Sequence, residues 1–144
     1  MKNMDVQRIE GGLHVDQRGV VSFVNDFDLK NVDRFYTVRA HTMGEPRGWV
    51  GHRKEHKWFS PLSGTILVAV VTPDDWELPA SNLLVQRYVL SSLKPVVLHV
   101  PASHATASVM LTANALLGVF SSGRIEDAGK DDWRFDVGTW DVKG

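Results

Sequence analysis

The chain has 144 residues, of which 43% are hydrophobic and 23% are charged, and its formal net charge is -1. These values fit one folded domain and exclude an intrinsically disordered chain, and the balanced charge excludes a general attraction to nucleic acid or to a membrane surface. The absence of cysteine excludes disulfides, thiolate metal sites and a cysteine nucleophile.

The sequence predicts no membrane-spanning or secretion segment. No run of about 18 apolar residues is present, and the N-terminal residues MKNMDVQRIEGG lack the apolar core of a secretion signal. We therefore expect a cytoplasmic protein that folds as a single domain over residues 1–144 and binds neither membranes nor nucleic acid.

Short runs of β-branched and aromatic residues predict strands along most of the chain, and turn-forming residues separate them. In chain order the runs are VVSFV (20–24), RFYTV (34–38), KWF (57–59), TILVAVV (65–71), LLVQRYVL (83–90), PVVLHV (95–100) and ALLGVF (115–120). The alanine-rich stretch 102–117 fits a helix on propensity, but its Ser, Thr, Val and Asn residues favour strands. Many short strands at this spacing predict an all-β sandwich or barrel.

The segment RGWVGHRKEHKWFSPLSG, residues 47–64, concentrates the side chains suited to chemistry. If its first part is extended, Val50 and His52 share one face, because alternate residues of a strand point the same way. Lys57 and Phe59 share a face of the next predicted strand. A barrel with His52 and Lys57 in its interior would place a base beside a cation, which suits removal of a proton next to a carbonyl.

Two other interpretations of the same segment remain open. His52 can be a hydrogen-bonded structural histidine with no catalytic role. Residues 52–56 also spell H-x-x-E-H, a zinc-protease motif, but the glycines before it and Ser60-Pro61 after it leave no room for the helix that this motif needs. A non-helical metal site formed by His52, His56 and His104 is a weaker alternative, because spacing does not fix its third ligand.

Several motifs in order along the chain resemble cupin-fold nucleotide-sugar enzymes. DQRG (16–19) is similar to the early D-x-R-G of the dTDP-4-dehydrorhamnose 3,5-epimerases. RFYTV followed by RGWVGHRK resembles the strand and R-G-x-H-x-H-K motif of the dTDP-sugar 3,4-ketoisomerases, and Lys57 falls at the lysine of the epimerases' K-L-V segment. LSSLKPVVLHVPASHA (90–105) is similar to their L-S-x-x-N…L-x-I-P-x-G-F-A-H. The resemblance covers about residues 16–136.

This resemblance implies an all-β cupin jelly-roll barrel (a double-stranded β-helix) that forms a homodimer and needs no cofactor or metal. It implies a dTDP-4-keto-6-deoxyhexose as substrate, in the synthesis of cell-surface carbohydrate such as lipopolysaccharide. His52 is the expected base and Lys57 the expected electrostatic stabiliser. The residues expected to contact the substrate are Arg18, Arg47, Trp49, Trp58 and His104. For the arginines, packing at turns or strand ends is an equally simple role, and the tryptophans fit a core.

The chain departs from the family pattern at the catalytic positions. Val50 occupies the place of the first histidine of R-G-x-H-x-H, which is the family's base, and valine cannot transfer a proton. Residues 121–135 contain no match for the late tyrosine that acts as the epimerases' acid, and Thr106 replaces the histidine of the later motif. The leading prediction is an isomerase of this type with His52 as its one base. The alternative is a catalytically inactive cupin that binds a nucleotide sugar or another small anionic ligand.

Overall fold

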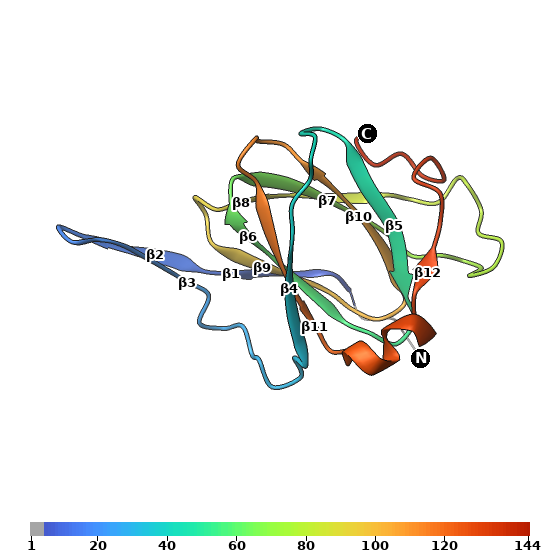
Figure 1. The fold of residues 1–144 in the computed structure, drawn as a ribbon, viewed down its shortest axis with the longest axis horizontal. Coiled ribbons are helices and arrows are strands. Elements are labelled where there is room, and N and C mark those ends of the chain that lie inside the picture. The colour runs from blue at the N-terminus through green and yellow to red at the C-terminus, as the bar shows by residue number, and fades with distance from the viewer. Residues whose placement is uncertain (1–4) are drawn as a thin grey trace.

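The computed structural model describes residues 5–144, which form two five-stranded antiparallel sheets and a separate hairpin (Figure 1). In the order of neighbouring strands, the first sheet contains β1 (Gln7–Glu10), β9 (Val96–Val100), β6 (Lys57–Ser63), β11 (Leu116–Ser121) and β4 (Arg34–Val38). The second contains β12 (Trp133–Arg134), β5 (Pro46–His52), β10 (His104–Met110), β7 (Thr65–Val71) and β8 (Gln86–Ser91). The hairpin pairs β2 (Gly12–Asp16) with β3 (Gly19–Phe23).

The all-β prediction is confirmed, and the alanine-rich stretch 102–117 contains β10 and the start of β11. The strands β1, β2 and β12 were not predicted, because they lack runs of β-branched and aromatic residues, and the 3-10 helix η1 (Ile125–Lys130) was not predicted either. Among residues 5–144, no helix is long and apolar enough to cross a bilayer.

Apolar side chains fill part of the space between the two sheets. They alternate along their strands with residues that face outward, as the period of two requires. The central members of this core are Phe59, Ile66, Val68, Val70, Leu90, Leu98, Leu117 and Val119. These residues hold the sheets together, and Phe59, Val68, Leu117 and Val119 also line an open cavity between the sheets.

A second apolar cluster covers the outer face of the second sheet. Trp49 lies there against Trp140 with ring centroids 5.3 Å apart, and its indole Nε1 donates to the carbonyl oxygen of Trp140 at 3.1 Å. Ala105, Ala107 and Val109 of β10 complete the contact. Both faces of this sheet are therefore buried, which explains why β7 is apolar at almost every position.

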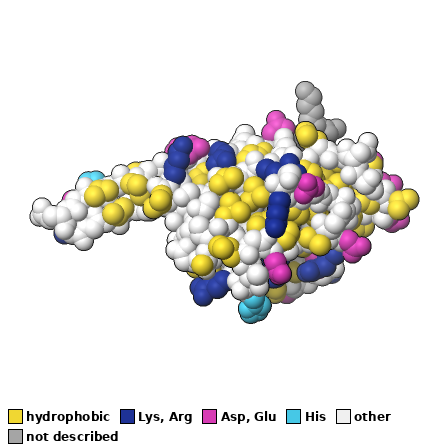
Figure 2. All heavy atoms as spheres, turned by 90° about the horizontal axis from the view of Figure 1, so that it is seen from above, with side chains coloured by type: hydrophobic (Ala, Val, Ile, Leu, Met, Phe, Trp, Pro, Cys, Tyr) yellow, Lys and Arg dark blue, Asp and Glu magenta, His cyan; other side chains and the backbone are white. Residues whose placement is uncertain are grey.

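The β2–β3 hairpin extends away from the two sheets, and hydrophobic side chains lie along it (Figures 1 and 2). The exposed hydrophobic residues of this hairpin are Leu13, Val15, Val20, Val21 and Phe23. An isolated two-stranded hairpin is only marginally stable in water, and exposed hydrophobic patches often mark contact surfaces.

Candidate functional site

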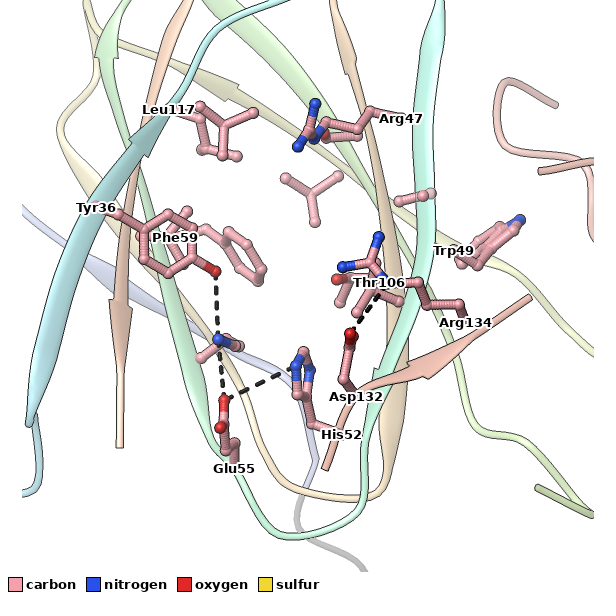
Figure 3. A pocket seen from close by; sticks show the side chains of 18 of the residues that line it. Tyr36, Arg47, Trp49, His52, Glu55, Phe59, Thr106, Leu117, Asp132 and Arg134 are labelled. Atoms are coloured by element: carbon pink, nitrogen blue, oxygen red, sulfur yellow. Dashed lines mark hydrogen bonds and ion pairs between the residues drawn. The ribbon is translucent and has the colours of Figure 1, made fainter. Parts of the chain in front are cut away.

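A cavity of ≈ 610 Å³ opens between the two sheets (Figure 3). Its walls come from β4, β6 and β11 on one side and from β5 and β10 on the other. The segment that contains η1 and β12 contributes to the lining through Gly129, Asp132, Arg134 and Phe135, among others. Side chains from distant parts of the chain thus meet in one open space.

The residues that were predicted to share a face of β5 or of β6 lie at this cavity. Val50 and His52 of β5 both line it, and so do Lys57 and Phe59 of β6. The predicted faces of the two strands are therefore confirmed. Trp58 points the opposite way, as the alternation requires.

Lys57 lines the cavity and is only 4% exposed. Its Nζ is 3.1 Å from Glu55 Oε2, and it donates hydrogen bonds to the hydroxyl groups of Tyr36 and Ser121, each at 3.2 Å. An ammonium has three hydrogens, and these three acceptors match them. Lys57 is therefore fully satisfied by protein groups.

The Glu55 carboxylate balances the positive charge of this region. Its Oε2 accepts a hydrogen bond from Ser121 Oγ at 3.1 Å and lies 3.8 Å from both Arg34 and His52 Nε2. Glu55 is 6% exposed, so its charge is compensated by these partners rather than by bulk water. Figure 3 shows the resulting chain of contacts from Tyr36 to His52.

Burial lowers the pKa of His52 below its usual value, and the positive charge of Lys57 lowers it further. The carboxylates of Glu55, Asp131 and Asp132 act in the opposite direction but are weaker causes. The imidazole is therefore neutral at neutral pH, and a neutral imidazole has one ring nitrogen that can accept a proton. This is the protonation state that a general base needs.

The turn that carries Glu55 is held by a carboxylate from the far end of the chain. Asp131 accepts hydrogen bonds from the backbone N–H groups of Arg53, Lys54 and Glu55 at 2.8, 2.8 and 2.9 Å. Successive N–H groups pointing at one anion form a nest, here filled by the protein itself. Asp131 thereby fixes the position of Glu55 relative to Lys57.

Arginines supply further positive charge to the cavity. Arg47 and Arg134 enter it from the side of β5, opposite Tyr36 (Figure 3). Arg134 Nε is 3.0 Å from Asp132 Oδ2. Arg34 also lines the cavity, and its buried Nε has no hydrogen-bond partner among residues 5–144. Guanidinium groups in this arrangement suit an anionic ligand.

The structure does not bring all of the predicted substrate contacts to this cavity. Trp49 is among the residues that line the cavity, but its indole is buried against Trp140 and points away from the cavity (Figure 3). Trp58 packs on the outer face of the first sheet, with its ring 5.0 Å from that of His99. Arg18 lies at the tip of the hairpin, where its guanidinium binds Asp16.

His104 is adjacent to His52 in the register of β10 and β5, but it lines a different and smaller cavity of ≈ 360 Å³. Its Nδ1 is 2.9 Å from the carbonyl oxygen of Pro101 and 3.2 Å from that of Ala102. His104 is therefore held by the turn before β10 and lies outside the group around Lys57.

The alternative metal site from His52, His56 and His104 is not assembled. Residues 53–56 form the turn between β5 and β6, so His52 faces the cavity, whereas His56 Nδ1 lies 3.0 Å from Nε2 of His99. Burial, followed by the neighbouring histidines, lowers the pKa of His99 to about 4. Among residues 5–144, no three His, Cys, Asp or Glu side chains are placed to hold a metal ion together.

Sequence reasoning missed several residues of the site: Arg34, Tyr36, Glu55, Ser121, Asp132 and Arg134. The alternation of RFYTV puts Arg34 and Tyr36 on one face of a strand, which was an available signal. Strand alternation gives no such signal for Glu55 and Ser121, because Glu55 lies in a turn and Ser121 lies at the end of a strand.

Solved structures share this fold, although neither a protein-family model nor a curated protein sequence matches the chain. A sugar 3,4-ketoisomerase from Thermoanaerobacterium thermosaccharolyticum in complex with TDP has a TM-score of 0.68 at 18% identity, over 88% of this chain and 85% of that one. The dTDP-4-dehydrorhamnose 3,5-epimerase of Bacillus anthracis, with TDP and pyrophosphate bound, has a TM-score of 0.72 at 17% identity, over 89% and 77%.

A 3'-monoepimerase from Streptomyces bikiniensis in complex with dTDP-quinovose has a TM-score of 0.71 at 16% identity, over 92% of this chain and 70% of that one. These similarities confirm the predicted cupin jelly-roll fold. The proteins also belong to the enzyme classes that the sequence motifs resemble.

Proposed function

We propose that this protein is an isomerase or epimerase of the nucleotide-sugar type, which acts on a 4-keto-6-deoxyhexose linked to dTDP. The observation that carries the proposal is His52, a neutral imidazole in a cavity with Lys57, Tyr36 and several arginines. The fold shared with a ketoisomerase and with epimerases supports the same reaction class. The role in cell-surface carbohydrate synthesis belongs to this proposal.

The chemistry proceeds by removal of a proton from the carbon next to the ketone. His52 takes this proton, and the negative charge that develops on the ketone oxygen is stabilised by the positive field of Lys57. Val50 cannot serve as a second base on the same strand. One base suits 3,4-ketoisomerisation, in which a proton leaves one carbon and returns to its neighbour.

The diphosphate of the substrate needs positive charge at the cavity. Arg47 and Arg134 provide it in planar groups that can bind phosphate oxygens in pairs. A diphosphate at the Arg134 guanidinium would compete with Asp132, its present partner. The diphosphate of the nucleotide would therefore be bound by residues other than His52, the proposed base.

We also propose that two copies of the chain associate through the β2–β3 hairpin. Among residues 5–144, its hydrophobic residues belong to neither apolar cluster of their own subunit, and a second sheet would bury them. Arg18 at the hairpin tip lies outside the cavity of its own chain, so the predicted contact with substrate requires a neighbouring subunit.

Introducing charge on the hairpin is expected to convert a dimer into a monomer. Val15 and Val20 are cross-strand partners and are 66% and 59% exposed, so Val15→Asp combined with Val20→Asp places two carboxylates in the buried contact. Sedimentation velocity measures the change. Leu78→Asp is the control, because Leu78 is an exposed hydrophobic residue elsewhere. A monomeric parent protein would contradict the proposed dimer.

A second candidate function is binding without catalysis. Val50 at the position of the family's base is the observation that favours it. Such a protein would hold the nucleotide sugar in the same cavity, with His52 as a hydrogen-bonding group only.

Solvent exchange separates the two functions. In D₂O, the protein is expected to incorporate deuterium beside the ketone of dTDP-4-keto-6-deoxyglucose, as observed by NMR, and dTDP should raise the melting temperature more than UDP or GDP does. A sample without protein controls for spontaneous exchange. Tight binding without exchange would establish the binding function instead, and absence of both binding and exchange would contradict both candidates.

A further inference from the structure

The smaller cavity, of ≈ 360 Å³, takes no part in the proposed reaction. Val70 and Tyr88 line it from β7 and β8 of the second sheet, and Val6 lines it from the position before β1 of the first sheet. His104, the first residue of β10, lines it as well. Pockets that bind small molecules usually measure about 300–1,000 Å³, so this volume suits a ligand of the size of a single ring.

The hydrogen bonds of His104 leave one ring nitrogen as an acceptor. His104 is 7% exposed, and its Nδ1 lies within hydrogen-bond distance of the carbonyl oxygens of Pro101 and Ala102. Carbonyl oxygens only accept, so Nδ1 carries a hydrogen, and in the neutral ring Nε2 is the acceptor. Nε2 has no hydrogen-bond partner among residues 5–144. The one fully buried side-chain nitrogen or oxygen without a partner in that range is Arg34 Nε, so His104 Nε2 is accessible from the cavity.

The other polar side chains of this cavity suit a ligand hydroxyl group. The Tyr88 hydroxyl donates to Gln86 Oε1 at 3.3 Å, which leaves the Tyr88 oxygen as an acceptor and the Gln86 amide nitrogen as a donor. Thr72 adds a hydroxyl that can do either. A ligand hydroxyl both donates and accepts, so it can satisfy His104 Nε2 and one of these groups together.

The charge of this cavity distinguishes it from the main one. Among the residues of the range 5–144 that line it, none is an arginine or a lysine, and Asp5 contributes a carboxylate. A phosphate would therefore be repelled here, whereas Arg34, Arg47 and Arg134 line the main cavity. The two cavities thus suit different classes of ligand.

The remaining lining of the smaller cavity is apolar. It consists of the side chains of Val6, Val70, Leu83 and Leu84. Leu84 is 79% exposed, so a ligand with an apolar body would remove part of its surface from water, which favours binding.

We propose that this cavity binds a small neutral molecule that combines an apolar ring or chain with a hydroxyl group, and that the hydroxyl donates to His104 Nε2. The site is separate from the main cavity and does not depend on the function proposed for it. The buried histidine gives the site its preference for a donor, and the valines and leucines give it its preference for an apolar body.

The probe is p-cresol, which joins an apolar ring to one hydroxyl group, and 4-methylanisole is the matched ligand, because its methylated oxygen cannot donate. In protein with ¹⁵N-labelled histidine, p-cresol should shift the Nε2 resonance of His104 in a saturable manner above the pH range in which histidine titrates. The hydrogen bond should make p-cresol bind about tenfold more tightly than 4-methylanisole. Saturating dTDP should leave the Kd of p-cresol unchanged.

Two exposed leucines between β7 and β8 provide matched variants. Leu84 lines the cavity, whereas Leu78 is 83% exposed and does not line it. Leu84→Trp should occupy part of the cavity and weaken the binding of p-cresol at least several-fold, and Leu78→Trp should leave it unchanged. His104→Phe removes the acceptor and should bring the Kd values of p-cresol and 4-methylanisole together.

Three results would overturn the proposal. The first is a His104 shift that stays linear up to the solubility limit of p-cresol, and the second is competition between p-cresol and dTDP. The third is equal affinity of Leu84→Trp and Leu78→Trp for p-cresol, which decides the matter also where His104→Phe folds poorly. Equal affinity of the unsubstituted protein for p-cresol and 4-methylanisole would overturn the contact between the hydroxyl and His104.

Discussion

Replacement of His52 by asparagine is expected to lower kcat by about 10³- to 10⁴-fold and to leave dTDP affinity nearly unchanged. Asparagine is close to histidine in size and can form hydrogen bonds, but it cannot accept a proton from carbon. The arginines proposed to hold the diphosphate are separate side chains, so binding should survive. Progress curves followed by NMR and calorimetric titration with dTDP measure the two effects.

The pH profile provides a second measure of His52. Its pKa is lowered, chiefly by burial, so the imidazole stays neutral below pH 6.5, where an exposed histidine would already be protonated. Activity should therefore be maintained as pH falls through 6.5 and decline only at lower pH.

The control for the His52→Asn substitution is His41→Asn, because His41 is exposed and does not line the cavity. More than a tenth of normal kcat in His52→Asn would contradict the role of His52 as base.

Replacement of Lys57 by methionine is expected to destabilise the fold by about 3–5 kcal/mol, because it leaves the buried Glu55 carboxylate without its closest cation. Lys57 and Glu55 are 4% and 6% exposed, so water does not compensate the lost charge. Arg34 remains 3.8 Å from Glu55 and offsets only part of the loss. Urea unfolding followed by tryptophan fluorescence measures the free energy of unfolding.

Two further variants isolate the cause. Lys54→Met removes a lysine from the same turn, but Lys54 is exposed, so the loss should stay below about 0.5 kcal/mol. Combining Lys57→Met with Glu55→Leu removes both charges and should recover most of the lost stability. A Lys57→Met variant as stable as the Lys54→Met control would show that the Lys57–Glu55 pair contributes no net stability.

Local alternation made part of the site predictable. The pairs Val50 with His52 and Lys57 with Phe59 follow from the period of two within a single strand, and the structure places all four at the cavity. The same rule separates Trp58 from Lys57. Residues within one strand can thus be assigned to a common face from the amino-acid sequence alone.

Other features depended on contacts between distant segments. Periodicity alone cannot show that the outer face of the second sheet is covered, so it cannot separate a ligand-binding Trp49 from a buried one. The position of Glu55 depends on the hydrogen bond that its backbone N–H donates to Asp131, which is 76 residues away along the chain. The β2–β3 hairpin was missed in part, because GLHVD mixes polar and apolar residues without a continuous β-forming run.

The contact between Asp131 and the turn at residues 53–55 also sets an order of events during protein synthesis. A ribosome releases β5 and β6, the two strands that flank this turn, before it releases Asp131. Until Asp131 has been released, three backbone amides of the turn lack the carboxylate that they bind in the folded protein. The sheets of a translation product that stopped before Asp131 would lack the anion that orients this turn, and its cavity would remain without an ordered charge network.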